Sequence, residues 1–385
     1  MAEDRIAIER IRLKDLLPFI DSRERQGEPG PLIPISRIRA EAFTRNPYAS
    51  PDEVVLLVGF LKNRCIGYHG LLPGLLLREN GRTARVYWMS TVYVADTFRG
   101  RGIAKSFVDS IISLGEDLVA TGVTPEAEKM LKSSGFQDIG EVPYVQLRLE
   151  RLLLPDFSDR IESFPEPVTE EANGTERYRE LKRQCYRMWI DGMPPLPETV
   201  SSRMVSKITA SEGKDFRGGP CFYRSIDVVN WMLSNPWVSS RDPLGRKDSD
   251  GTAHYYFTEQ REIFKYFAFE FYGKGAKNPS GHLVLSVSGT GRATTVKILD
   301  HATGTASAGL QAIFTALTVA RDYLADRVDI PTGLIDAFPH RNSAGFLMKA
   351  QTRPYFAHPA DADSPLAKSI GRLRFQYFDG DTPFT

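Results

Sequence analysis

One stretch decides the fold: Trp88–Phe107, which reads WMSTVYVADTFRGRGIAKSF. It begins as a run of β-branched and aromatic residues that stops at Asp96, a pattern typical of a strand. A basic, glycine-containing turn follows at 99–102, and a helix is predicted to open at Ile103. A strand, a turn rich in free backbone N–H groups and a helix N-terminus together make an anion site. The segment therefore predicts a phosphate-bearing, nucleotide-type cofactor.

The bulk composition limits the classes of protein. The chain has 385 residues, of which 42% are hydrophobic and 25% charged, so we expect a globular protein of two domains. With 49 basic and 48 acidic residues the net charge is +1, and we expect no nucleic-acid partner. No apolar run approaches the roughly 20 residues of a membrane helix, so we expect no membrane insertion.

Location and metal content follow from the same reading. The first residues, MAEDRIAIER, lack the layout of a signal peptide, which predicts a cytoplasmic protein. Cys65, Cys185 and Cys221 are few and far apart, and the six histidines are scattered. These residues form no metal-binding spacing, so no metal site is predicted.

Residues 1–152 are predicted to form one domain, a mixed and mostly antiparallel twisted sheet flanked by helices, in the α/β (α+β) class. Hydrophobic periodicity places its elements. The predicted strands are Ile6–Leu13, Val54–Leu61, Cys65–Leu72, Arg85–Val94, Asp117–Thr121 and Val145–Leu149, and the helices are Leu16–Arg25, Ser36–Phe43, Ile103–Leu114 and Pro125–Ser134.

A proline-containing linker is predicted at 153–175 and a second domain at 176–385. The predicted strands of this domain are Phe264–Tyr272, Leu283–Val287, Thr294–Leu299, Gly333–Ala337 and Arg372–Phe378, and the helices are Leu310–Leu324 and Asn342–Gln351. The third strand stops at Asp300 and is followed by a glycine- and threonine-containing turn, in the order of the first domain. That order suggests a diverged internal duplication, although unrelated α/β domains also look alike at this level.

The opening segment resembles the cofactor-binding segment of the GNAT acyltransferase superfamily, a strand followed by Q/R-x-x-G-x-G/A and a helix. Arg99, Gly102 and Ala104 occupy those positions. The superfamily then carries a helix patterned N-x-x-A-x-x-x-Y that ends in G-F. Thr124, Ala127 and Leu131 stand at those positions here, followed by 135–136, which reads GF. The resemblance covers about 150 residues, and the second domain shares only the order of elements.

The resemblance implies that acetyl-CoA, or another short acyl-CoA, is the cofactor. The backbone N–H groups of the turn and the helix dipole would hold its pyrophosphate. The residues implied for cofactor binding are Val92, Tyr93, Val94, Arg99, Gly100, Arg101, Gly102, Ile103, Ala104 and Thr124. In the second domain, 301–305 reads HATGT and has no basic residue, so we expect a degenerate copy that contributes to substrate specificity.

The resemblance also implies a chemistry. In the superfamily the long strand splays from its neighbour and exposes an amide to the thioester carbonyl, here the amide of Val92 or Tyr93. An acid on that strand and a tyrosine on the later helix usually move protons, but this strand has no acid and the tyrosine position is Leu131. The amine could arrive deprotonated, or other groups could substitute. The candidate catalytic residues are Ser90, Thr91, Tyr144 and His69.

Near the chain end, Asp379 and Asp381 offer a further alternative, because they could reach the interdomain cleft and bind an amine. The expected function is transfer of an acetyl group to a primary amine of a small molecule by direct attack. Two alternatives stay open: a catalytically silent acyl-CoA sensor or scaffold, and an aminoacyl transferase of the cell-wall-precursor type. Homodimerisation is also left open.

Overall fold

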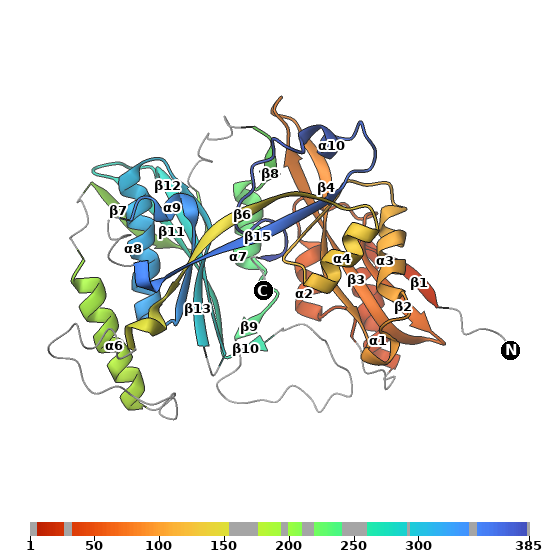
Figure 1. Ribbon diagram of the computed structural model, residues 1–385, viewed down its shortest axis with the longest axis horizontal. Helices are drawn as coiled ribbons and strands as arrows, with labels where there is room; N and C mark the ends of the chain where they lie inside the picture. The colour runs from red at the N-terminus through yellow and green to blue at the C-terminus, as the bar shows by residue number, and fades with distance from the viewer. Residues whose placement is uncertain are drawn as a thin grey trace.

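The computed structural model describes residues 6–26, 33–153, 176–193, 199–209, 219–240, 260–290, 293–338 and 345–382. The predicted linker lies almost wholly outside them, so the predicted domain bounds stay a prediction. The described elements form two halves that share one large mixed sheet with helices on its faces (Figure 1). The sheet has 13 strands, in the order β1-β2-β3-β4-β5-β15-β6-β14-β13-β12-β11-β7, with β8 attached to β3.

The first half follows the predicted alternation of strands and helices. Its elements are β1 (Ala7–Arg12), α1 (Leu16–Gln26), α2 (Arg37–Thr44), β2 (Val54–Leu61), β3 (Arg64–Leu77), β4 (Thr83–Val94), α3 (Ile103–Ile112), β5 (Leu118–Thr121), α4 (Pro125–Ser133) and β6 (Gln137–Arg148). Local signals explain several boundaries. Lys62 and Asn63 take positive φ in the tight β2–β3 turn, and Ser36 caps α2 by accepting from the N–H of Arg39.

The second half contains the remaining described elements. These are α6 (Glu176–Asp191), β7 (Val200–Val205), β8 (Cys221–Tyr223), α7 (Ile226–Ser234), β9 (Ser239–Ser240), β10 (Gln260–Arg261), β11 (Ile263–Gly273), β12 (Gly281–Thr290), β13 (Ala293–Thr303), α8 (Ala306–Asp322), β14 (Arg327–Pro331), α9 (Thr332–Ile335), β15 (Met348–His358) and α10 (Pro365–Ser369). The strands β9 and β10 form a separate two-stranded sheet.

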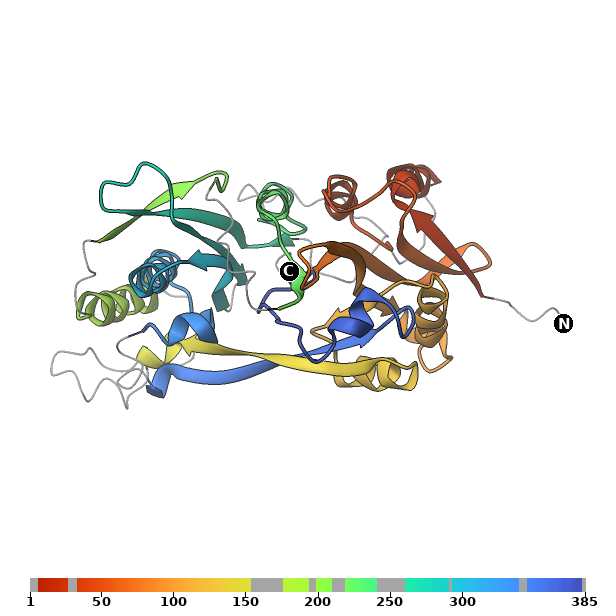
Figure 2. The same ribbon diagram turned by 90° about the horizontal axis from the view of Figure 1, so that it is seen from above.

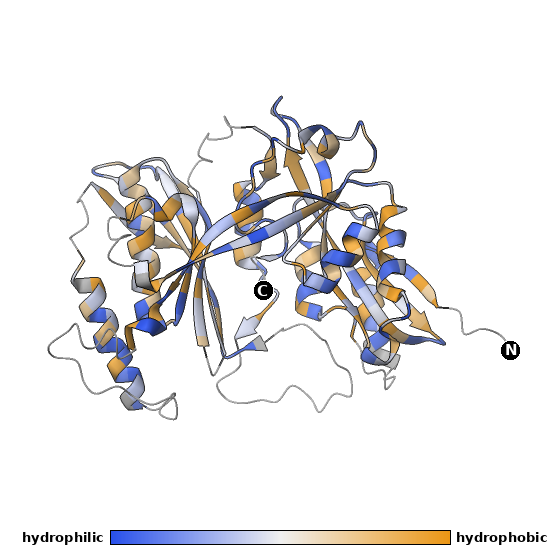
Figure 3. Cartoon of the chain, in the orientation of Figure 1, coloured by the Kyte–Doolittle hydropathy of each residue, from blue (hydrophilic) through white to orange (hydrophobic). Residues whose placement is uncertain are grey.

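Two long strands exchange places between the halves. β6 leaves the first half and pairs with β14, while β15 returns from the second half and pairs with β5. β6 and β15 also pair with each other, antiparallel, from Met348 opposite Leu147 to Ala357 opposite Gln137. Figure 2 shows the two strands, yellow and blue, running side by side beneath both halves, and Figure 3 shows that they contain both hydrophilic and hydrophobic residues. The exchange makes the two halves parts of one sheet.

Three predicted elements have the wrong type, and two predicted strands have one end misplaced. The strand expected at 145–149 begins at Gln137, because its first residues pair with β15. The strand expected to stop at Asp300 continues to Thr303, because β12 pairs with it throughout. In the expected strand 333–337 the chain forms α9, and β14 precedes it.

The last two errors lie further along the chain. Within the expected helix 342–351, residues 342–344 lie outside the described residues, and β15 begins at Met348. The expected strand 372–378 is an irregular segment with one isolated bridge, between Arg374 and Cys221. The start of β15 pairs with β6 of the first half and Arg374 pairs with Cys221, and local sequence does not reveal such distant partners.

Hydrophobic side chains cover both faces of the first-half sheet. Phe107 and Ile111 of α3 are fully buried on one face. The opposite face packs against α2 and the second half, where Trp231 donates its indole N–H to the carbonyl of Ala42 at 2.9 Å and the Trp237 ring stacks on Phe43. Trp231 and Trp237 therefore pack the second half against α2.

The buried carboxylate of Asp117 binds the segment that follows β15 to the first half. Asp117 is 4% exposed and accepts hydrogen bonds from the backbone N–H groups of Ala360 (2.9 Å) and Leu366 (3.0 Å). We expect Asp117→Ala to lower the free energy of unfolding by about 2–4 kcal/mol, because two buried N–H groups lose a charged acceptor. The measurement is the midpoint of urea denaturation.

The matched control is Asp52→Ala, which removes an exposed carboxylate that binds Lys14. Solvent-exposed ion pairs contribute little, so its midpoint should not change measurably. Equal midpoints for the two variants would contradict a structural role of Asp117.

Candidate active site

The strands β4 and β5 diverge in the centre of the first half. They are parallel and pair only at Tyr87 with Leu118 and at Trp88 with Val119, although β4 continues to Val94. β4 is also bulged against β3, and Thr91 there takes a φ of 42°. Beyond Trp88 the edge of β4 that faces β5 is therefore open, as the predicted splay requires.

The basic turn lies directly after β4 and leads into α3. Gly100 and Gly102 have φ of 76° and 77°, a left-handed conformation that residues with a side chain adopt only with strain. A Cβ added to either glycine would meet no atom within 4 Å, so the space beside the turn is open. Gly102 is the N-cap of α3 and offers no side chain to cap it. The N–H groups of the first turn are thus left to an external acceptor, and the helix dipole favours an anion there.

Two arginines flank this turn. Arg99 donates from Nε to the carbonyl of Val94 at 3.1 Å and forms an ion pair with Asp96 at 2.9 Å. Its guanidinium also lies 5.5 Å from the ring centre of Tyr93, and that of Arg101 lies 5.4 Å from the ring centre of Phe98. The loop is held on β4 while both cations stay exposed, an arrangement that fits a pyrophosphate.

The acid that β4 lacks comes from the end of the chain. The Ser90 hydroxyl donates to the carboxylate of Asp381 and accepts a 2.6 Å hydrogen bond from Arg39. Arg39 is itself buried, and its guanidinium lies 4.1 Å from the ring centre of Trp237. Asp381 therefore lies on the open part of the cofactor strand, although it follows Ser90 by 291 residues.

Close packing against Trp88 holds this C-terminal segment on β4. Gly380 has a φ of 78°, and an added Cβ would lie 3.0 Å from Cε3 of Trp88. Trp88 and Ser90 are alternate residues of one strand, so they share a face and lie about 7 Å apart. The C-terminal segment therefore runs along β4, with Gly380 against Trp88 and Asp381 against Ser90.

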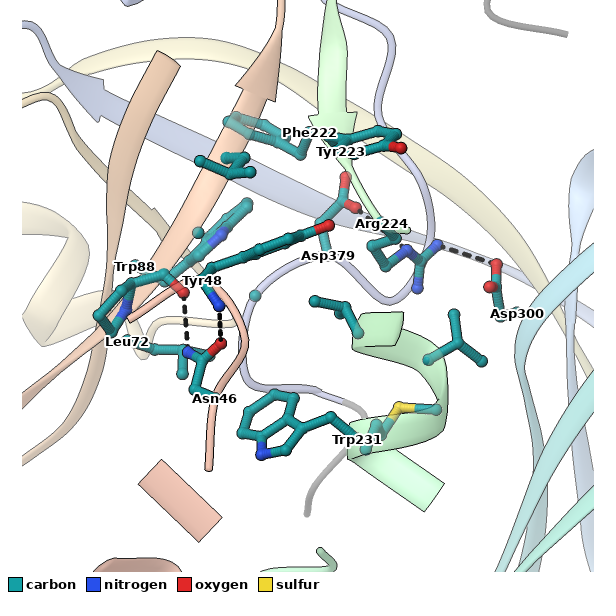
Figure 4. A pocket seen from close by; sticks show the side chains of 17 residues that line it. Asn46, Tyr48, Leu72, Trp88, Phe222, Tyr223, Arg224, Trp231, Asp300 and Asp379 are labelled. Atoms are coloured by element: carbon teal, nitrogen blue, oxygen red, sulfur yellow. Dashed lines mark hydrogen bonds and ion pairs between the residues drawn. The ribbon is translucent and has the colours of Figure 1, made fainter. Parts of the chain in front are cut away.

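A small cavity of about 60 Å³ lies beside Asp379. Its walls are mainly apolar and include the aromatic rings of Trp88, Tyr48 and Phe222, with Arg224 at one side (Figure 4). The Trp88 and Phe222 rings meet edge to face at 4.5 Å. A cavity that has aromatic rings and the carboxylates of Asp379 and Asp300 in its wall suits an amine, which gains both cation–π attraction and an ion pair.

Buried charges surround Asp379. Arg224 donates to the carbonyl of Leu299 at 3.1 Å and lies 3.5 Å from Asp300 and 4.0 Å from Asp379. Burial alone would raise the pKa of Asp300, but Arg224 and then His282 hold that pKa well below its ordinary value. Burial raises the pKa of Asp379 to about 7, against the lowering effect of Arg224. Asp300 is thus the carboxylate paired with Arg224, and Asp379 changes charge near neutral pH.

The structure gathers only some of the predicted catalytic residues. Ser90 and Thr91 lie at the bulge. His69 is opposite it on β3 but is 2% exposed, and burial lowers its pKa to about 3. Tyr144 lies on β6 between the halves, with its ring 4.1 Å from that of Tyr377. In the described part of the chain, no hydrogen bond joins His69 or Tyr144 to Ser90 or Asp381.

Two further predicted positions have local structural partners. Thr124 is the N-cap of α4, where its hydroxyl accepts from the N–H of Ala127. Leu131, at the tyrosine position, is buried in the core. Arg39, Arg224 and Trp88 were not predicted as site residues. Arg39 reaches Ser90 from α2, and Arg224 and Trp88 line the small cavity from the two halves.

The second half repeats the splay without the anion loop. β13 pairs in parallel with β14 only from Thr295 to Lys297 and then continues to Thr303. At the start of α8, however, the Thr305 hydroxyl accepts from the N–H of Ala308 at 3.1 Å. The Thr305 hydroxyl thus occupies, at the N-terminus of α8, the position that an anion could occupy at the N-terminus of α3.

Two general properties complete the site. Within the described ranges, no three His, Cys, Asp or Glu side chains are grouped so that they could hold a metal ion. No helix in the same ranges is long and apolar enough to cross a membrane.

The raised pKa of Asp379 predicts a pH-dependent stability. Between about pH 4 and pH 7 the folded state holds a proton that the unfolded chain has released, so stability falls by up to about 1.4 kcal/mol per pH unit as pH rises through that window. Asp379→Asn cannot ionise and should lack this decline. Urea denaturation from pH 5 to pH 8 tests it, and parallel curves for the variant and the wild type would contradict it.

Comparisons with known proteins bear on the fold. No family model and no curated protein matches the chain. Among solved structures, N-myristoyltransferase from Saccharomyces cerevisiae with bound myristoyl-CoA matches at a TM-score of 0.51 and 10% identity, over 93% of this chain and 80% of that one.

Two further structures match with lower scores. A tandem GNAT protein from the clavulanic acid biosynthesis pathway has a TM-score of 0.46 and 13% identity, over 93% of this chain and 99% of that one. A GCN5-related N-acetyltransferase from Anabaena variabilis has a TM-score of 0.47 and 12% identity, over 93% and 74%. The chain thus shares the fold of N-myristoyltransferase. It also has the two features that the sequence resemblance implied, a parallel strand pair that splays and a glycine turn before the next helix.

Proposed function

We propose that the protein is an acyl-CoA-dependent N-acyltransferase that acylates a primary amine of a small molecule, with acetyl as the preferred acyl group. One observation carries the proposal: a single strand, β4, combines the splayed edge, the basic glycine turn and a carboxylate at Ser90. An anion loop alone would suit many cofactors. Its position directly after a splayed strand suits a cofactor that runs from the loop into the splay.

The residues present fit CoA. The uncapped N-terminus of α3, Gly100 and Gly102 would receive the pyrophosphate, and Arg99 and Arg101 would add positive charge. The open edge of β4 would direct the amide of Val92 or Tyr93 at the acyl carbonyl. Bound acyl-CoA supplies a thioester, whose acyl carbon forms the new bond to the amine nitrogen as its C–S bond breaks.

The carboxylates of the C-terminal segment would handle the amine. Asp379 would hold it in the aromatic cavity, and Asp381 would accept the proton that the amine must lose. The Ser90 hydroxyl and, behind it, Arg39 orient the Asp381 carboxylate. Asp381 would thus take the role of the acidic residue that β4 lacks.

The cofactor site is tested by the thermal stability of the protein with CoA. CoA at a hundred times its Kd should stabilise the wild type by about 2.7 kcal/mol. Arg99→Glu should lose most of this effect, because it places a negative charge beside the pyrophosphate. Arg321→Glu is the matched control, since Arg321 also pairs with a neighbouring aspartate, at 3.1 Å, but lies on α8. Full stabilisation of Arg99→Glu would show that the cofactor site is misplaced.

The role of Asp381 is tested by turnover. Asp381→Asn keeps an oxygen for Ser90 but cannot accept a proton at neutral pH, so kcat should fall about 100- to 10,000-fold while stabilisation by CoA persists. Asp363→Asn, at an aspartate whose side chain is 93% exposed, is the control. An unchanged kcat in Asp381→Asn would remove Asp381 from the mechanism.

The activity itself is tested by thiol release from acetyl-CoA across a panel of primary amines. Release that depends on the amine, with formation of the N-acetyl product, supports the proposal. Stabilisation by CoA without release for every amine would favour the silent sensor instead.

A further inference from the structure

A second, larger cavity opens in the second half. Its volume is about 560 Å³, in the size range of small-molecule sites. The splayed end of β13 forms one wall and 331–333 another, and residues 374–378 of the C-terminal segment close it. The cavity occupies the position in the second half that corresponds to the β4–β5 opening in the first.

The lining is unsuited to a second nucleotide. The N-terminus of α8 is already capped by Thr305, and 301–305 carries no basic residue. The guanidinium of Arg224 is engaged with Asp300, Gln376 and two backbone carbonyls. Arg374, the other cation of the lining, is exposed and contacts Cys221. The cavity interior therefore offers no concentrated positive charge to a phosphate or carboxylate.

The polar groups of the lining are mostly neutral and both donate and accept. Ser280, Thr303 and Thr332 contribute hydroxyls to it. Burial lowers the pKa of His301 to about 4, so its imidazole is neutral at pH 7. His282 is 4% exposed, and its Nδ1 has no hydrogen-bond partner in the described part of the chain. The hydroxyls and the neutral His301 imidazole match ligand hydroxyls, which also donate and accept.

One ion pair lies in the walls of both cavities. Arg224 and Asp300 line both of them, and Figure 4 shows Arg224 between Asp379 and Asp300. At the same place Asp379 is 1% exposed, and its Oδ1 has no hydrogen-bond partner among the described residues. A buried carboxylate oxygen without a donor is costly, and an ammonium group in the small cavity would supply one.

We propose that the acceptor is a polyhydroxylated primary amine of the amino-sugar class. Its amino group lies beside Asp379 in the aromatic cavity, and its hydroxyl-bearing part extends past Arg224 and Asp300 into the second-half cavity. The inference rests on the proposed acyltransferase function and assigns the two cavities to two parts of one substrate. A site built to hydrogen-bond hydroxyls discriminates strongly against an analogue that lacks them.

The test uses the wild-type protein with acetyl-CoA and three amines of similar ring size: D-glucosamine, cyclohexylamine and 4-aminocyclohexanecarboxylate. We expect kcat/KM for glucosamine to exceed both others by at least about tenfold. A preference for the apolar or the carboxylate-bearing amine, or equal values, overturns this inference but leaves the acyltransferase function standing. Acylation of none of the amines overturns both.

Two variants test whether the preference for the hydroxylated amine comes from the second-half cavity. Gly333 lines the large cavity and Gly345 does not, and an added Cβ meets nothing within 4 Å at either residue. Gly333→Trp should lower the ratio of kcat/KM for glucosamine to that for methylamine by about tenfold or more, relative to Gly345→Trp. Stabilisation by CoA reports that each variant is folded. An unchanged ratio in a folded Gly333→Trp overturns the assignment of the cavity.

Discussion

The structure depends on the antiparallel pairing of β6 with β15. Each strand completes the sheet of the half to which it does not belong in sequence, since β6 pairs with β14 and β15 with β5. The ladder between them satisfies the backbone groups of both over about ten residues, so neither half can close its sheet without the other. The two halves are therefore held in one fixed relation.

The fixed relation of the halves explains how the Asp381 carboxylate comes to lie beside Ser90 of the first half. Once β15 has crossed beside β5, the chain that follows must continue over the first half, where Asp117 binds it. The same chain then passes Trp88 at Gly380 and ends the described structure beside Ser90. The burial that this path imposes on Asp379 also raises the pKa of that carboxyl. Strand exchange thus links the architecture to the chemistry of the site.

The two halves show how one backbone geometry can serve two purposes. Both contain a bulged antiparallel pair followed by a short parallel pair that splays. They differ at the next turn, where α3 begins at an uncapped glycine between arginines and α8 begins at a threonine that caps it. The internal duplication stays a hypothesis, but the difference in capping is sufficient to distinguish an anion site from a neutral cavity.

The sequence by itself determined what depends on neighbouring residues. β-Branched runs, glycines at positive φ and capping threonines act within a few residues. The elements of the first half, the glycine turn before α3 and the mixed α/β fold class could therefore be predicted from the sequence. Only the tertiary structure decided the partners of β6 and β15, the position of Asp381 beside Ser90 and the cluster around Arg224. These contacts join residues far apart in the chain, and no local pattern encodes them because their energy comes from pairing and burial between the halves.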